Sequence, residues 1–74
     1  MPYVNIKVTK EGGPNGTGPS DDEKAELIKG TTELLSRVLG KNPATTMVVI
    51  DEVALGDWGI GGLPVPEFRK QQST

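Results

Sequence analysis

Hydrophobic and polar side chains alternate near the N-terminus. Val4, Ile6 and Val8 occupy every second position between Tyr3 and Thr9. A period of two is typical of a strand with one apolar face. The next ten residues, 10–19, contain four glycines and two prolines, which is typical of a loop. The pattern therefore predicts a strand over residues 3–9 followed by a connector.

The segment from Ser20 to Gly40 carries the signals of one amphipathic helix. Ser20 and Glu23 have the spacing of a capping box, and Gly40 is a typical helix end. Gly30, inside the helix, costs about 1 kcal/mol relative to alanine, so we expect a close backbone contact there. Residues at three- and four-residue steps form one stripe: Leu27, Ile28, Thr31, Leu34, Leu35, Val38 and Leu39.

A turn is predicted over residues 41–44 and a second strand over residues 45–53. The strand contains an unbroken apolar run, MVVI, at residues 47–50. A run without alternation is typical of a strand buried on both faces. Strand, helix and strand form a βαβ unit, whose crossover is expected to be right-handed and whose strands are expected to be parallel.

The C-terminal third is rich in glycine. Residues 56–66 (GDWGIGGLPVP) have the spacing of a tight hairpin, and the polar tail, residues 69–74, is expected to fray. Two parallel strands and one helix cannot close a core. We therefore expect the C-terminal arm to lie across a neighbouring subunit.

Composition supports association. The chain has 74 residues, of which 34% are hydrophobic and 16 are glycine or proline. A core of this size supplies only about 3–5 kcal/mol, and no cysteine is present to add a disulfide. The expected fold is α+β: one domain over residues 1–74, a short β-α-β protomer with a C-terminal β-hairpin. We expect it to form an oligomer.

Charge and residue types exclude several functions. The net charge is -2, whereas nucleic-acid binding favours a basic surface. With neither cysteine nor histidine, thiol nucleophiles, histidine bases and the usual zinc ligands are excluded. Asp51 and Glu52 are adjacent and should point to opposite faces of a strand. No segment is long and apolar enough to span a membrane. We therefore expect a cytoplasmic protein with no metal, no cofactor, no nucleic-acid partner and no membrane partner.

Pro2 is the candidate with unusual chemistry. Methionine before proline is normally removed during synthesis, which would leave a secondary amine as a free base. Alternatively, Pro2 starts an edge strand, where a missing N–H is harmless. Trp58, the only tryptophan, is either a core or interface aromatic or one that stacks on a ligand.

Four segments in order resemble the 4-oxalocrotonate tautomerase family. They are residues 2–8 (PYVNIKV), 20–24 (SDDEK), 48–53 (VVIDEV) and 58–62 (WGIGG). The resemblance implies a β-α-β protomer that dimerises through its sheets and assembles as a hexamer. It also implies an N-terminal proline that moves a proton between an enol oxygen and a carbon next to a carbonyl.

By this resemblance, Pro2 is the catalytic base, and Trp58 and Ile60 line the apolar wall. The family's two arginines are missing: one position falls on Pro19, the other on Met47 or Val48. Lys10, in a loop longer than in typical members, is our candidate for binding the substrate carboxylate. Other candidates, from a neighbouring chain, are Lys7, Arg37, Lys41 and Arg69. The expected substrate is a small 2-oxo or 2-hydroxydienoate acid.

The chemistry of Pro2 depends on its environment. An α-amino group titrates near pH 8, and an apolar pocket would lower the pKa of its ammonium toward the working pH, where a base is most effective. Two alternatives stay open: a hydratase or decarboxylase of a small oxo acid that uses protonated Pro2, and a non-catalytic assembly module.

Overall fold

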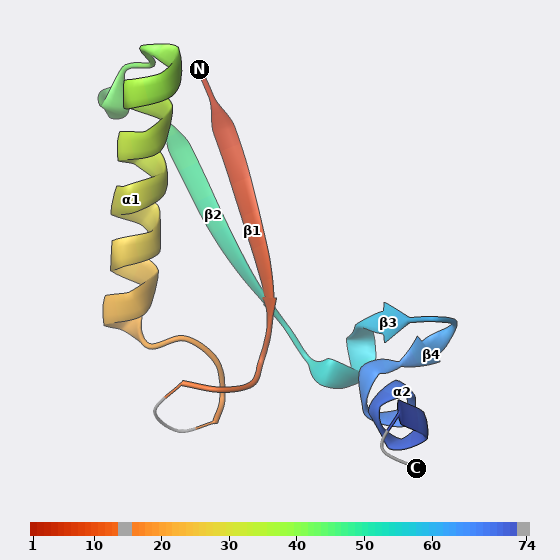
Figure 1. Cartoon of the computed structure of the whole chain (residues 1–74). Helices are drawn as coiled ribbons and strands as arrows, with labels where there is room; N and C mark the ends of the chain where they lie inside the picture. Colours follow the sequence, from red (N-terminus) through yellow and green to blue (C-terminus); the bar gives the residue numbers. More distant parts are fainter. Residues whose placement is uncertain (14–15, 73–74) are drawn as a thin grey trace.

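The computed structural model describes residues 1–13 and 16–72; Pro14 and Asn15 of the predicted loop, and Ser73 and Thr74 of the predicted tail, lie outside this part. The N-terminal half consists of β1 (Tyr3–Thr9), α1 (Asp21–Leu39), a short 3-10 helix η1 (Pro43–Thr45) and β2 (Met47–Val53). The two strands are parallel, in a register that runs from Tyr3 opposite Met47 to Thr9 opposite Val53. Helix α1 lies alongside the two-stranded ribbon (Figure 1). The predicted βαβ unit is confirmed.

The predicted capping box sets the start of α1. The Ser20 side chain accepts a hydrogen bond from the Glu23 N–H at 3.1 Å, and the Ser20 N–H donates to Glu23 Oε1 at 2.8 Å. At the other end Gly40 has a φ of 66°, the left-handed conformation that glycine tolerates. The expected contact at Gly30 is wrong, because a Cβ there would meet no atom within 4 Å among the described residues.

Adjacent carboxylates on β2 point to opposite faces of the ribbon, as the sequence predicts. Glu52 accepts a hydrogen bond from Lys24 of α1 at 2.8 Å. Asp51 faces away from α1 and accepts from Asn5 at 2.9 Å and from Lys7 at 2.8 Å. This opposition also rules out an Asp51–Glu52 carboxylate pair.

The second strand starts later and is less buried than its sequence predicts. Thr45 belongs to η1, where its hydroxyl donates to the Asn42 carbonyl at 3.3 Å. In β2, Met47 and Val49 are 48% and 40% exposed. The apolar run does not produce burial on both faces, because α1 covers only one of them.

The C-terminal module, residues 54–72, contains a 3-10 helix η2 (Leu55–Asp57), strands β3 (Gly59–Ile60) and β4 (Leu63–Pro64), and helix α2 (Val65–Gln72). The two short strands are antiparallel, which confirms the predicted hairpin. The expectation of a frayed tail is wrong for residues 69–72, which belong to α2. Phe68 holds this helix on the hairpin: a Cβ at Gly61 would lie 3.3 Å from its ring.

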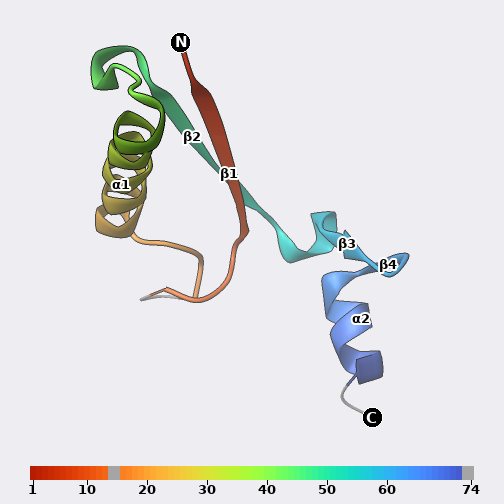
Figure 2. The same ribbon diagram turned by 45° about the horizontal axis from the view of Figure 1, so that its top comes forward.

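The described residues do not form a compact core. Val65, at 7% exposure, is their only buried hydrophobic residue. The radius of gyration is 15.7 Å, whereas a compact domain of this length has a radius of about 11 Å. The C-terminal module projects from the end of the ribbon opposite the N-terminus, as Figures 1 and 2 both show. No helix in the described part is long and apolar enough to cross a membrane.

Candidate active site

Pro2 lies at the start of β1. It is half-buried, and its carbonyl accepts a hydrogen bond from the Met47 N–H at 3.0 Å. Met1 is 85% exposed. Met47 is thus a direct neighbour of Pro2 and brings a thioether to one of the two positions where the resemblance places an arginine.

Trp58 lies at the other end of the ribbon, directly after η2. It is half-buried, and its carbonyl accepts from the Val65 N–H at 2.9 Å, which links it to the start of α2. Beside Trp58 lies a shallow, open cavity of about 360 Å³, which is lined by Lys7, Val53, Asp57, Trp58 and Gly59. Ile60 follows on β3 and is 45% exposed, but it does not line this cavity.

One protomer does not bring Pro2 and Trp58 together. Strand β1 has 7 residues, and a rise of about 3.3 Å per residue places its ends about 20 Å apart. Pro2 precedes this strand, whereas Trp58 follows Val53, which pairs with the last residue of β1. A site that contains both side chains therefore needs a second copy of the chain.

The two lysines near the Trp58 end have different partners. Lys7 lines the cavity, but its ammonium is paired with Asp51 at 2.8 Å. This pair raises the pKa of Lys7 and lowers the pKa of Asp51. Lys10 is exposed and does not line the cavity. Its backbone N–H donates to the Val53 carbonyl at 2.8 Å, one residue beyond the paired part of β1. Its ammonium has no partner within residues 1–13 and 16–72.

The sequence analysis did not predict a hydrogen-bonded network of side chains at the Trp58 end of the ribbon. Arg69 of α2 binds Glu11 with both guanidinium nitrogens, at 2.8 and 3.0 Å, and the Thr9 hydroxyl also donates to Glu11. These bonds, first those from Arg69 and then that from Thr9, lower the pKa of Glu11 to about 2. Glu11 and Arg69 are 58 positions apart, so no local pattern could have joined them.

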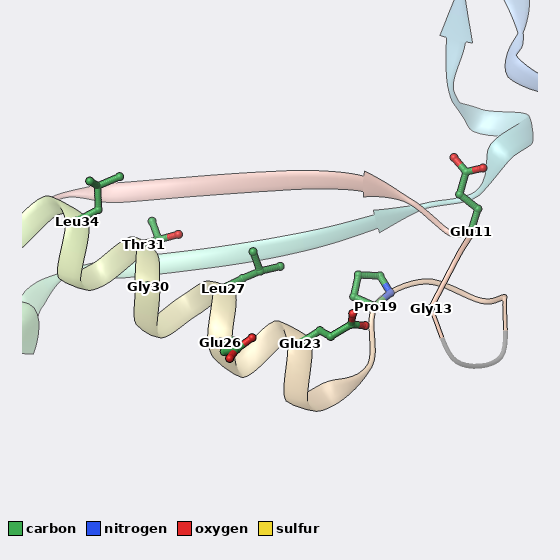
Figure 3. A pocket seen from close by; sticks show the side chains of 9 residues that line it. All are labelled: Glu11, Gly13, Pro19, Glu23, Glu26, Leu27, Gly30, Thr31 and Leu34. Atoms are coloured by element: carbon green, nitrogen blue, oxygen red, sulfur yellow. The ribbon is translucent and has the colours of Figure 1, made fainter.

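The larger groove is in a different place. It has a volume of about 590 Å³ and runs along α1 from the glycine-rich loop toward Leu34. Figure 3 shows Leu27, Thr31 and Leu34 projecting from α1 toward the strands, with Glu11 and Pro19 at the loop end. It contains neither Pro2 nor Trp58, and its charged lining is acidic. We therefore place the candidate site at the ends of the ribbon, not in this groove. In the described part no three carboxylates are arranged as metal ligands.

Comparison with known proteins gives a consistent result. Residues 2–67 match the family model described as "Tautomerase enzyme". The chain is 52% identical over 73 residues to the probable tautomerase K2 of Dickeya dadantii, covering 99% of this chain and 100% of that protein. It is 42% identical over 70 residues to a 2-hydroxymuconate tautomerase of Pseudomonas putida, covering 95% and 100%. The crystal structure of DmpI from Helicobacter pylori superposes with a TM-score of 0.80 at 40% identity, covering 93% and 97%.

The fold and these similarities define the class of protein. The chain belongs to the tautomerase family, and it is an isomerase. The resemblance drawn from four short segments is confirmed.

Proposed function

We propose that the chain catalyses the cofactor-independent keto–enol tautomerisation of a small 2-oxo or 2-hydroxydienoate acid, with Pro2 as general base after removal of Met1. The observation that carries this proposal is that the tautomerase match starts at Pro2, the residue directly after Met1. The similarity to a protein named 2-hydroxymuconate tautomerase supports a dienol acid as the substrate class.

The proposed reaction needs only one proton carrier. The neutral Pro2 amine removes a proton from the enol oxygen or from the carbon next to the carbonyl. The resulting ammonium returns it at another carbon, so no atom is gained or lost. An apolar surrounding disfavours the ammonium and lowers its pKa, which keeps part of the amine neutral at the working pH. Trp58 and Ile60 would supply this apolar wall.

The site that we propose is shared between copies of the chain. Pro2 of one protomer would meet Trp58 and Ile60 of another, because the two ends of one ribbon are too far apart. Exposed apolar side chains on the open face of the ribbon, Tyr3, Met47 and Val49, support packing of another copy against this face. We propose a dimer or a hexamer as the working assembly.

Lys10 remains our proposal for the carboxylate-binding residue. Its ammonium is exposed and unpaired in the described part of the chain, whereas Lys7 and Arg69 are held by Asp51 and Glu11. An unpaired ammonium can bind a carboxylate without first giving up an internal partner.

Mass spectrometry before and after exposure to an α-halo-2-oxo acid at neutral pH tests the proposal. We expect an intact mass without Met1 and alkylation at Pro2 alone. A variant with one extra residue between Met1 and Pro2, which turns the proline nitrogen into an amide, is the control and should stay unlabelled. Met-free protein that stays unlabelled while turning over a 2-oxo acid would show that Pro2 is not the neutral base.

A further inference from the structure

Arg69 is already occupied by a carboxylate of its own chain. Its guanidinium nitrogens bind the two carboxylate oxygens of Glu11 at 2.8 and 3.0 Å. This bidentate contact is the geometry in which arginine typically binds a carboxylate ligand. Thr9 donates a further hydrogen bond to the same carboxylate. Glu11 therefore takes the place that a substrate carboxylate would take on this arginine.

Glu11 and Arg69 lie at the Trp58 end of the molecule. Thr9, which binds Glu11, pairs in register with Val53, and Val53 lines the cavity that contains Trp58. From the other direction, α2 carries Arg69 and begins at Val65, whose N–H binds the Trp58 carbonyl. Both connections place the Glu11–Arg69 pair at the same end of the ribbon as this cavity, between it and the groove along α1, which Glu11 lines.

Among the described residues, charge pairing at this end leaves Lys10 as the available cation. Lys7 is neutralised by Asp51 and Arg69 by Glu11, whereas Lys10 has no partner among the described residues. A substrate with one carboxylate can pair with Lys10. A second carboxylate on the same substrate could not pair with Arg69, because Glu11 already binds this arginine. The negative charge of Glu11 would also repel the second carboxylate.

We propose that Glu11 is a specificity-determining residue that reserves the site for substrates with a single carboxylate, by keeping the guanidinium of Arg69 occupied. This inference rests on the proposed function for the identity of the site. It deepens that function by choosing monocarboxylate over dicarboxylate dienols.

A free dicarboxylate competes poorly with Glu11 for physical reasons. The fold already holds Glu11 against Arg69, so their contact does not pay the entropy cost of bringing a free ligand to the site. The pKa of Glu11 is about 2, so it stays ionised and paired at neutral pH. A substrate carboxylate that displaced it would still lie next to a freed negative charge, which opposes binding.

Two readouts test this proposal. The first is kcat/KM for 2-hydroxymuconate, which has two carboxylates, and for 2-hydroxypentadienoate, which lacks the second one. The second is binding of 2-oxoadipate and 2-oxohexanoate, a dicarboxylate and its monocarboxylate counterpart, followed by the fluorescence of Trp58. Binding does not depend on proton transfer. A failure of the proposed function, seen as binding without turnover, is thus distinguishable from a failure of this inference.

The decisive variant is Glu11→Gln, which keeps the size of the side chain and removes its charge. We expect wild type to prefer the monocarboxylate in both readouts. In Glu11→Gln the dicarboxylate should improve by about 10-fold or more, because a charge-assisted contact to freed Arg69 becomes available. The monocarboxylate should change by less than about 3-fold. Adding Arg69→Gln to this variant should abolish the gain.

The control is Glu67→Gln, which removes the carboxylate of an exposed pair with Lys70 on the same helix and should leave both preferences at wild-type values. The near-ultraviolet circular dichroism of Trp58 and the sedimentation of each variant check that the module stays folded and assembled. A folded Glu11→Gln protein with an unchanged dicarboxylate-to-monocarboxylate ratio would overturn the proposal. The same conclusion follows if both ligands improve equally, or if the gain survives Arg69→Gln.

Discussion

The N-terminal half, residues 1–53, and the C-terminal module, residues 54–72, bury their apolar side chains to different extents. The larger half has an amphipathic helix and two strands, yet Leu34, Val38 and Val49 remain 47%, 60% and 40% exposed. The smaller module contains Val65, the only buried hydrophobic residue of the described part. A hairpin with a helix across it packs locally, whereas a two-stranded parallel ribbon with one helix leaves a whole face open. The difference supports the proposal that another copy packs on the N-terminal half.

The candidate site divides along the same boundary. Pro2 belongs to the ribbon, whereas Trp58 and Ile60 belong to the module. In the site that we propose, the two parts meet between two copies of the chain. The predictions below test this division, from the largest expected effect to the smallest.

Pro2→Ala should have the largest effect on activity. Loss of a positioned general base lowers kcat by about 10²- to 10⁴-fold, while sedimentation and thermal unfolding should match wild type. Trp58→Ala should instead raise KM, since it removes part of the binding wall. Steady-state kinetics of both variants separates the two roles; equal losses of kcat in both would contradict the assignment.

Mixing the two defective variants tests whether the site is shared. If Pro2 and Trp58 of one site come from different copies, random reassembly of an equal mixture restores about one quarter of the sites. The mixture is unfolded, refolded and assayed against each variant refolded alone. A mixture no more active than the two separate variants would show that each site is built from one chain.

Val49→Asp should break the assembly. Val49 is 40% exposed on the open face of the ribbon, so a carboxylate there is tolerated in an isolated protomer. Buried against another copy without a partner, it would cost several kcal/mol. Sedimentation velocity should show smaller species for Val49→Asp and wild-type assemblies for Val49→Ala. Intact assemblies of Val49→Asp would show that this face is not an interface.

Val65→Ala should destabilise the C-terminal module without dissociating the assembly. It deletes two buried methyl groups at about 0.8 kcal/mol each plus a cavity term, or about 2 kcal/mol in total. Denaturant unfolding followed by Trp58 fluorescence measures this loss directly. A loss below about 0.5 kcal/mol would mean that Val65 is less buried than the structure places it.

The smallest effect is expected from pH at the Glu11–Arg69 pair. The pKa of Glu11 is lowered from 4.5 to about 2, so its folded-state pKa lies below its unfolded value. Its stabilising contribution is present above pH 4.5 and is lost as the pH falls toward 2. The stability difference between wild type and Glu11→Gln should therefore shrink over this window. A difference that is constant from pH 6 to pH 2 would contradict the pairing.

Much of the fold could be read from local patterns. Ser20 and Glu23 marked the start of α1, Gly40 its end, and the glycines around Ile60 a hairpin, because each signal acts within a few residues. Two expectations were wrong for non-local reasons. Val49 was expected to be buried but is exposed, and residues 69–72 were expected to fray but belong to α2. One reason is the absence of a second layer on the ribbon, and the other is the packing of Phe68 on Gly61.

The candidate site was only partly predictable. Pro2 and Trp58 could be proposed from the sequence because their chemistry depends on their residue type and on a recognisable order of motifs. Glu11 could not, because its importance comes from Arg69, a partner 58 positions away.

The sequence alone therefore determined the helix, the strands, the hairpin and the family, all of which depend on short-range spacing and residue chemistry. The tertiary structure decided where the ends of the ribbon lie, which cations are already paired and which faces stay open. These properties arise from contacts between residues that are far apart in the sequence. The local alternation of apolar and polar positions does not predict such contacts.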